Sequence, residues 1–77
     1  MKIIERTLFN RESSCVPVIE IDTAEEAART LQALAAFAVS EIVTGSLTDI
    51  EKHRITVSDI CARIVYPNGD ILEYYIE

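Results

Sequence analysis

Two apolar segments near the N-terminus have the composition of β-strands. Residues 2–9 mix Ile, Thr, Leu and Phe with charged residues, and residues 15–21 are rich in β-branched side chains, which strands favour. The polar run at residues 10–14 predicts a loop between them. Pro17 has no N–H to donate to a neighbouring strand, so the second strand is expected at a sheet edge or at a bulge. We therefore expect an N-terminal hairpin.

The middle of the chain repeats apolar residues every three to four positions, which is typical of an amphipathic helix. Thr23 and Glu26 have the spacing of a capping box, so the helix is expected to begin near Ala24. Gly45 can adopt the left-handed conformation that ends a helix, so the helix is expected to run to about residue 43 or 44. The face expected to enter the core is mostly alanine: Ala24, Ala27, Ala28, Leu31, Leu34, Ala35, Ala38, Val39 and Ile42.

The opposite face of this helix is polar except at Ala33, Ala36 and Phe37. A second capping-box spacing predicts one helical turn near residues 48–53. The sequence therefore leaves two explanations for the aromatic ring of Phe37 on this polar face. Leu47 and Ile50 from that turn cover the ring, or the ring forms an exposed contact patch.

The C-terminal part of the chain predicts a second hairpin, with two β-rich runs separated by the turn sequence YPNGD. A two-residue Asn-Gly turn would leave both faces of the hairpin mixed. A type I turn with a one-residue bulge at Gly69 instead pairs Tyr66 with Asp70 and gives one continuous apolar face. We choose the bulged register, because a slip by one residue turns every side chain to the wrong face. Its further pairs are Ile64 with Leu72, Ala62 with Tyr74, Ile60 with Ile76 and Arg63 with Glu73.

The expected fold is a single α+β domain spanning residues 1–77. Its element order is β-β-α-β-β, a four-stranded, mostly antiparallel sheet with the long helix on one face. Residues 54–57 either extend the C-terminal hairpin or lead into a short helix capped by Ser58 and Asp59.

The chain has 7 Lys and Arg against 13 Asp and Glu, a net charge of −6 and a sequence pI near 4.6. This charge repels a phosphate backbone, so no direct nucleic-acid partner is expected. No apolar run reaches the 18 or so residues of a membrane span, and no membrane partner is expected. The N-terminus lacks the apolar core of a signal peptide and the two cysteines are too few for a disulfide framework, so we expect a cytoplasmic protein.

The residues that could carry chemistry are few. His53 is the only histidine, and its spacing from Cys15 and Cys61 matches neither a nucleophile–base pair nor a zinc site. Gly45 and Gly69 are explained by a helix end and a turn, which leaves no glycine-rich loop for a phosphate. We expect no enzymatic activity, no metal and no cofactor.

Two features remain that could bind a protein partner. One is the apolar interruption of the helix, and the other is an acidic cluster where the second strand meets the helix. The predicted partner-binding residues are Phe37, Ala33, Ala36, Glu20, Asp22, Glu25 and Glu26. The leading hypothesis is a small non-enzymatic regulator or inhibitor that occupies a surface of a larger partner or of its own copy, as in a phage or mobile-element setting. The alternative is a small enzyme or ligand-binding subunit whose site forms between protomers around His53 or a cysteine.

Overall fold

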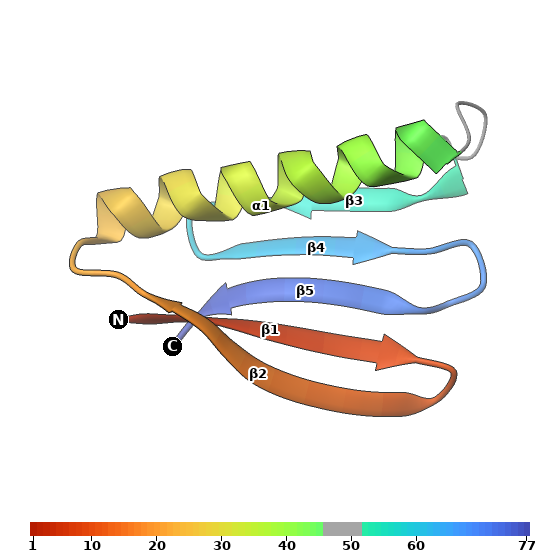
Figure 1. Cartoon of the computed structure of the whole chain (residues 1–77), viewed down its shortest axis with the longest axis horizontal. Coiled ribbons are helices and arrows are strands. Elements are labelled where there is room, and N and C mark those ends of the chain that lie inside the picture. Colours follow the sequence, from red (N-terminus) through yellow and green to blue (C-terminus); the bar gives the residue numbers. More distant parts are fainter. Residues whose placement is uncertain (46–51) are drawn as a thin grey trace.

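The computed structural model describes residues 1–45 and 52–77, which form one antiparallel sheet and a long helix (Figure 1). The described elements are β1 (Lys2–Phe9), β2 (Glu12–Glu20), α1 (Ala24–Gly45), β3 (Arg54–Val57), β4 (Cys61–Val65) and β5 (Ile71–Ile76). The sheet has the strand order β2-β1-β5-β4-β3, so the two chain ends meet where β1 pairs with β5.

The predicted α+β class is confirmed, but the predicted number of strands is wrong. The sheet has five strands rather than four, and the element order is β-β-α-β-β-β. The extra strand is β3, which pairs antiparallel with β4. The hydroxyl of Ser58 accepts the backbone N–H groups of Ile60 and Cys61 at 3.3 and 3.2 Å. These bonds make the segment a tight turn between two strands, and the alternative of a short helix capped there is wrong.

The N-terminal hairpin is confirmed, but the loop expected at residues 10–14 is wrong. The turn consists of Asn10 and Arg11, which have φ angles of 52° and 68°, and β2 begins at Glu12. Pro17 behaves as predicted, because β2 is an edge strand and its pairing with β1 shifts register between Ile3 and Ile4.

The C-terminal hairpin has the bulged register that the face pattern predicts. Tyr66 donates its N–H to the carbonyl of Asp70 at 2.8 Å, and Gly69 has a φ of 92°. Ile64 lies opposite Leu72, as expected. The further pairs of Ala62 with Tyr74 and Arg63 with Glu73 are confirmed, and Ile76 donates its N–H to Ile60.

The helix begins as expected, since the N–H of Glu26 donates to Thr23 Oγ1 at 3.2 Å. It continues through Gly45, one or two residues beyond the predicted end. Leu31 and Ala27 are fully buried, whereas Ala24, expected on the core face, is exposed. The core cluster joins this side of the helix to both hairpins: Ile3, Ile21, Ala27, Leu31, Ala35 and Ala62, with Leu34, Tyr74 and Ile76 packed against it.

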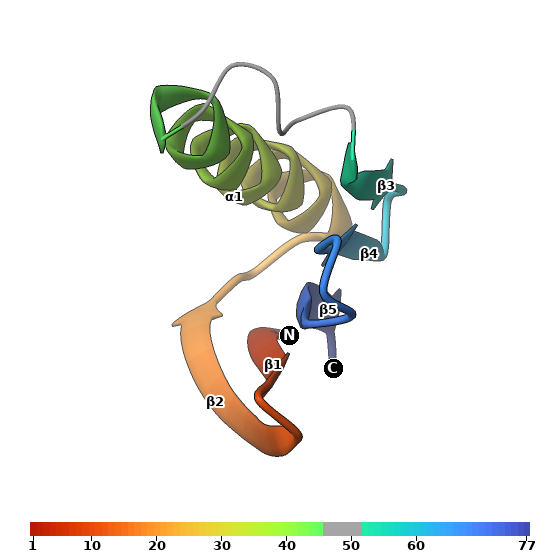
Figure 2. The ribbon, with the colours of Figure 1, turned by 90° about the vertical axis from the view of Figure 1, so that its right-hand side faces the viewer.

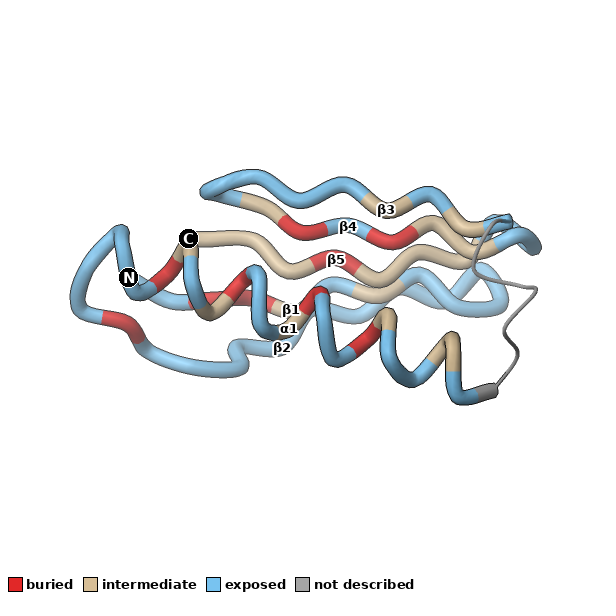
Figure 3. The backbone as a smooth tube through the Cα atoms, turned by 90° about the horizontal axis from the view of Figure 1, so that it is seen from above, coloured by how far each residue is buried: buried red, intermediate tan, exposed pale blue. Residues whose placement is uncertain are grey.

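The helix covers only part of one face of the sheet. It contacts β3, β4 and β5, while β2 curves away on the other side of β1 (Figure 2). The buried residues lie in the middle strands, along one stripe of α1 and at Ile21 in the connection between β2 and α1, whereas β2 is exposed along its whole length (Figure 3).

The other face of the sheet has no layer over it among the described residues. Because side chains alternate along a strand, the neighbours of core residues such as Ile3 and Tyr74 point to this side. We call it the open face, and its side chains include Ile4, Arg6, Glu73 and Tyr75. Within the described residues, no helix is long and apolar enough to span a membrane.

Candidate functional site

The surface of α1 turned away from the core carries the apolar residues that the sequence predicts for partner binding. Phe37 is 64% exposed, and Ala33 and Ala36 are exposed beside it. Positions three and four residues apart on a helix are neighbours, so the three side chains form one surface, here called the helix patch. The two residues proposed as a cover for the ring, Leu47 and Ile50, lie outside the described residues.

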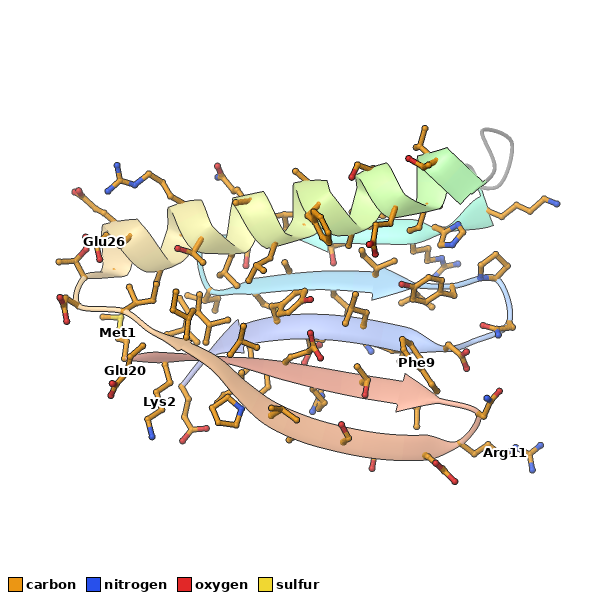
Figure 4. All side chains as sticks on the ribbon, in the orientation of Figure 1. Met1, Lys2, Phe9, Arg11, Glu20 and Glu26 are labelled. Atoms are coloured by element: carbon orange, nitrogen blue, oxygen red, sulfur yellow. The ribbon has the colours of Figure 1, made fainter. Side chains whose placement is uncertain are left out.

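The four predicted acids lie at the end of the molecule where α1 begins, and all four are exposed. Glu25 and Glu26 occupy the first turn of the helix, where carboxylates are favoured by the helix dipole. Glu20 ends β2 and is paired with Lys2 of β1, and Figure 4 shows both residues near the chain start. Asp22 lies in the short connection that follows.

The structure does not bring these acids into contact with the helix patch. Glu26 and Phe37 share one side of α1, but they are eleven residues apart, which is about 16 Å at 1.5 Å per residue. The outer surface of the helix is therefore an acidic end followed by an apolar patch. A partner has to extend over about three turns to contact both.

The three residues considered for an enzyme, Cys15, Cys61 and His53, also lie far apart within one chain. Cys15 lies in β2 and Cys61 in β4, with β1 and β5 between them. Three strand spacings are about 14 Å, so these free thiols cannot form a disulfide within one chain. His53 precedes β3, whereas Cys61 lies beside the opposite end of that strand.

The chemistry of these residues is equally unfavourable for a nucleophile. Burial, the carboxylate of Glu73 and a hydrogen bond to it raise the pKa of the Cys61 thiol, which reduces its reactive thiolate fraction. The ring of His53 packs edge-on against Tyr66, with 5.0 Å between centroids. Among the described residues, no group of three or more His, Cys, Asp or Glu side chains could hold a metal ion.

The open face carries a charged row, Arg6–Glu73–Arg63, of which the sequence predicts only the Arg63–Glu73 pair. Glu73 is 7% exposed and lies between two half-exposed arginines. Arg6 Nη2 donates to Glu73 Oε1 at 2.6 Å, and Arg63 Nε approaches Oε2 at 3.6 Å. The Arg6 guanidinium also lies 5.8 Å from the ring centroid of Tyr75. The register of the C-terminal hairpin predicts that Arg63 lies beside the Glu73 carboxylate. Arg6 belongs to the other hairpin and lies beside Glu73 only because β1 pairs with β5.

A second feature that sequence reasoning missed is an aromatic cluster at the far end of the sheet. Phe9 packs edge-on against Tyr66 at 5.9 Å between centroids, beside an open hollow of about 580 Å³. Asp70 accepts the backbone N–H of Asn10 at 3.2 Å and the side-chain amide of Asn68 at 3.0 Å. These contacts tie the tips of the two hairpins together. The only feature of the sequence that could have predicted this cluster is the aromatic residue directly before each hairpin turn, Phe9 and Tyr66.

Tyr74 is the tyrosine most strongly perturbed by its surroundings. Partial burial, a hydrogen bond to the carboxylate of Glu5 and the nearby charge of Glu41 raise the pKa of Tyr74 to about 12. The phenol is therefore a neutral structural group at physiological pH, and it links β5 to β1 under the helix.

Comparison with protein-family models, with curated proteins and with solved structures gave no match.

Proposed function

We propose that this chain is a small non-enzymatic protein that acts by contact, with the outer surface of α1 occupying an apolar, basic surface of a protein partner. The exposure of Phe37 at 64% is the observation that carries this proposal. A buried aromatic side chain is among the residues that most often dominate the energy of an interface. The small neighbours Ala33 and Ala36 let a partner approach the ring closely.

Charge supports the same surface. Glu25 and Glu26 precede the patch on α1, and the whole chain carries a net charge of −6. A basic partner surface is attracted by this field, which speeds association and weakens as salt screens it. Binding through α1 is therefore expected to be salt-sensitive.

The enzymatic alternative gains no support from the described geometry. Within one chain Cys15, Cys61 and His53 are separated, so the alternative requires a site between two copies, and the raised pKa of the Cys61 thiol opposes nucleophilic chemistry at that residue. The two free thiols fit a reducing compartment, and we propose a cytoplasmic site of action.

The test is affinity capture from extracts of the organism that encodes the chain, with quantitative mass spectrometry. Wild type, Phe37→Ser and Ile60→Ser serve as baits. Ile60, which is 68% exposed in the turn between β3 and β4, is a matched control for loss of exposed apolar surface. Proteins retained by wild type and Ile60→Ser but lost with Phe37→Ser support the proposal. Equal capture by all three baits contradicts it.

A further inference from the structure

The open face concentrates positive charge on an otherwise acidic chain. Four of the seven Lys and Arg residues occupy alternating positions on it: Lys2, Arg6, Arg54 and Arg63. Of the described acids, Glu20, Glu73 and Glu77 adjoin this face: Glu20 lies opposite Lys2, and Glu73 is paired with two arginines. The open face therefore carries four cations and three acids, a small positive excess, whereas the rest of the chain is strongly acidic.

Apolar side chains lie on both sides of the charged row. Across β1, β5 and β4 the open face has three parallel rows: Ile4–Tyr75–Cys61, Arg6–Glu73–Arg63 and Leu8–Ile71–Val65. Leu8 is 37% exposed, and Ile71, Val65 and Tyr75 are partly exposed. Sheets normally bury such a face against another layer. The open face thus combines a small excess of positive charge with rows of apolar side chains, which is the chemistry required of a partner for α1.

We infer that the open face of one copy receives the outer surface of α1 from a second copy, in a head-to-tail contact. This inference rests on the proposed function, because it uses the same helix surface. The second copy offers Glu25 and Glu26 to the cations, and Phe37 to the apolar rows. The sheet becomes the middle layer between its own helix and that of the neighbour.

Dimensions support this occupant. α1 has 22 residues and is about 33 Å long, against a longest molecular extent of 37 Å. Pairing two open faces instead would bring like-charged arginines together. The charge pattern therefore favours a contact between different surfaces, which can repeat from copy to copy.

The test uses sedimentation of the full chain over a range of concentrations at low and high salt. Wild type is expected to associate beyond a dimer, or to close into a ring, and to dissociate as salt rises. The variant Leu8→Glu/Arg54→Glu reverses the chemistry of the open face at two exposed positions that make no described ion pair. It should weaken self-association tenfold or more, as should Phe37→Ser. Circular dichroism and melting establish that each variant is folded. If the double variant unfolds, Arg54→Glu alone replaces it, and the expected loss of self-association is then smaller.

Mixing the two variants gives the decisive measurement. Phe37→Ser retains an intact open face and the double variant retains an intact helix surface. An equimolar mixture should therefore form a one-to-one dimer that grows no further, although each variant alone is monomeric. A monomeric wild type, or a mixture that stays monomeric, overturns the inference. If wild type is monomeric while Phe37→Ser still loses a captured partner, the proposed function survives and only the self-contact fails.

Discussion

Arg6 Nη2 donates to Glu73 Oε1 at 2.6 Å, and this ion pair joins the two hairpins across the centre of the open face. Arg6 belongs to β1 and Glu73 to β5, so the contact spans nearly the whole chain. The carboxylate is 7% exposed, whereas the arginine side chain is 51% exposed. The pair is therefore anchored on the buried acid.

Glu73→Gln should lower the free energy of unfolding by about 1.5–3 kcal/mol, the usual range for hydrogen bonds that involve charged groups. The amide keeps the shape of the side chain but leaves Arg6 and Arg63 without their anion. Urea denaturation measures the change, with Glu77→Gln at the exposed C-terminus as the control. An unchanged midpoint for Glu73→Gln would mean that the charged row does not stabilise the sheet.

Leu31→Ala should destabilise the domain by about 2–5 kcal/mol, because Leu31 is 0% exposed on the core face of α1. The sequence predicts the same cost for Leu34→Ala, but Leu34 is only partly buried. Its loss should be smaller, about 1–2 kcal/mol, since part of the side chain already contacts water. Denaturant midpoints in the reverse order would show that the wrong stripe of the helix has been assigned to the core.

Phe37→Ser should change the free energy of unfolding by about 0.5 kcal/mol or less, as expected for an exposed position. The same variant should reduce partner binding or self-association. Thermal melting and sedimentation on one preparation compare the two effects. A large fall in melting temperature with unaltered association would show that the ring is covered and is not a contact residue.

Stability should fall in alkaline solution as the pH passes from about 10 to about 12. The folded pKa of Tyr74 is raised to about 12 from an ordinary value of 10.0, so in this window the unfolded chain has lost a proton that the folded chain keeps. The stabilisation is complete below pH 10 and disappears above the folded pKa. Absorbance titration of the phenolate and melting at each pH measure the effect. In the Tyr74→Phe variant, stability should fall less steeply with rising pH. An equally steep fall in that variant would mean that other groups cause the loss of stability.

Cys61 should alkylate slowly at neutral pH in the folded chain and quickly in urea. Burial and the adjacent Glu73 carboxylate raise the pKa of this thiol, which lowers its thiolate fraction until unfolding removes both causes. The variant Cys15→Ser leaves a single thiol for the rate measurement. Equal rates in the two solvents would reopen the possibility of a reactive cysteine.

The predictions that the structure confirms depend on residues close together in the sequence. The Thr23–Glu26 cap lies within one turn of the helix, and the bulge at Gly69 follows from the face pattern of adjacent strands. Exposure of Phe37 was one of two alternatives that the pattern left open. The two-residue turn at Asn10 and Arg11 was missed because it places an arginine at positive φ, which turn preferences do not favour.

The helix, both hairpins, the C-terminal register and the acidic character of the chain follow from the sequence alone, because each depends on neighbouring residues or on composition. The folded structure alone shows that β1 pairs with β5 and that Arg6 reaches Glu73. It also decided which cations gather on the open face. These features join segments far apart in the chain, and their pairing depends on how the two hairpins dock around the core formed by Ile3 and Leu31.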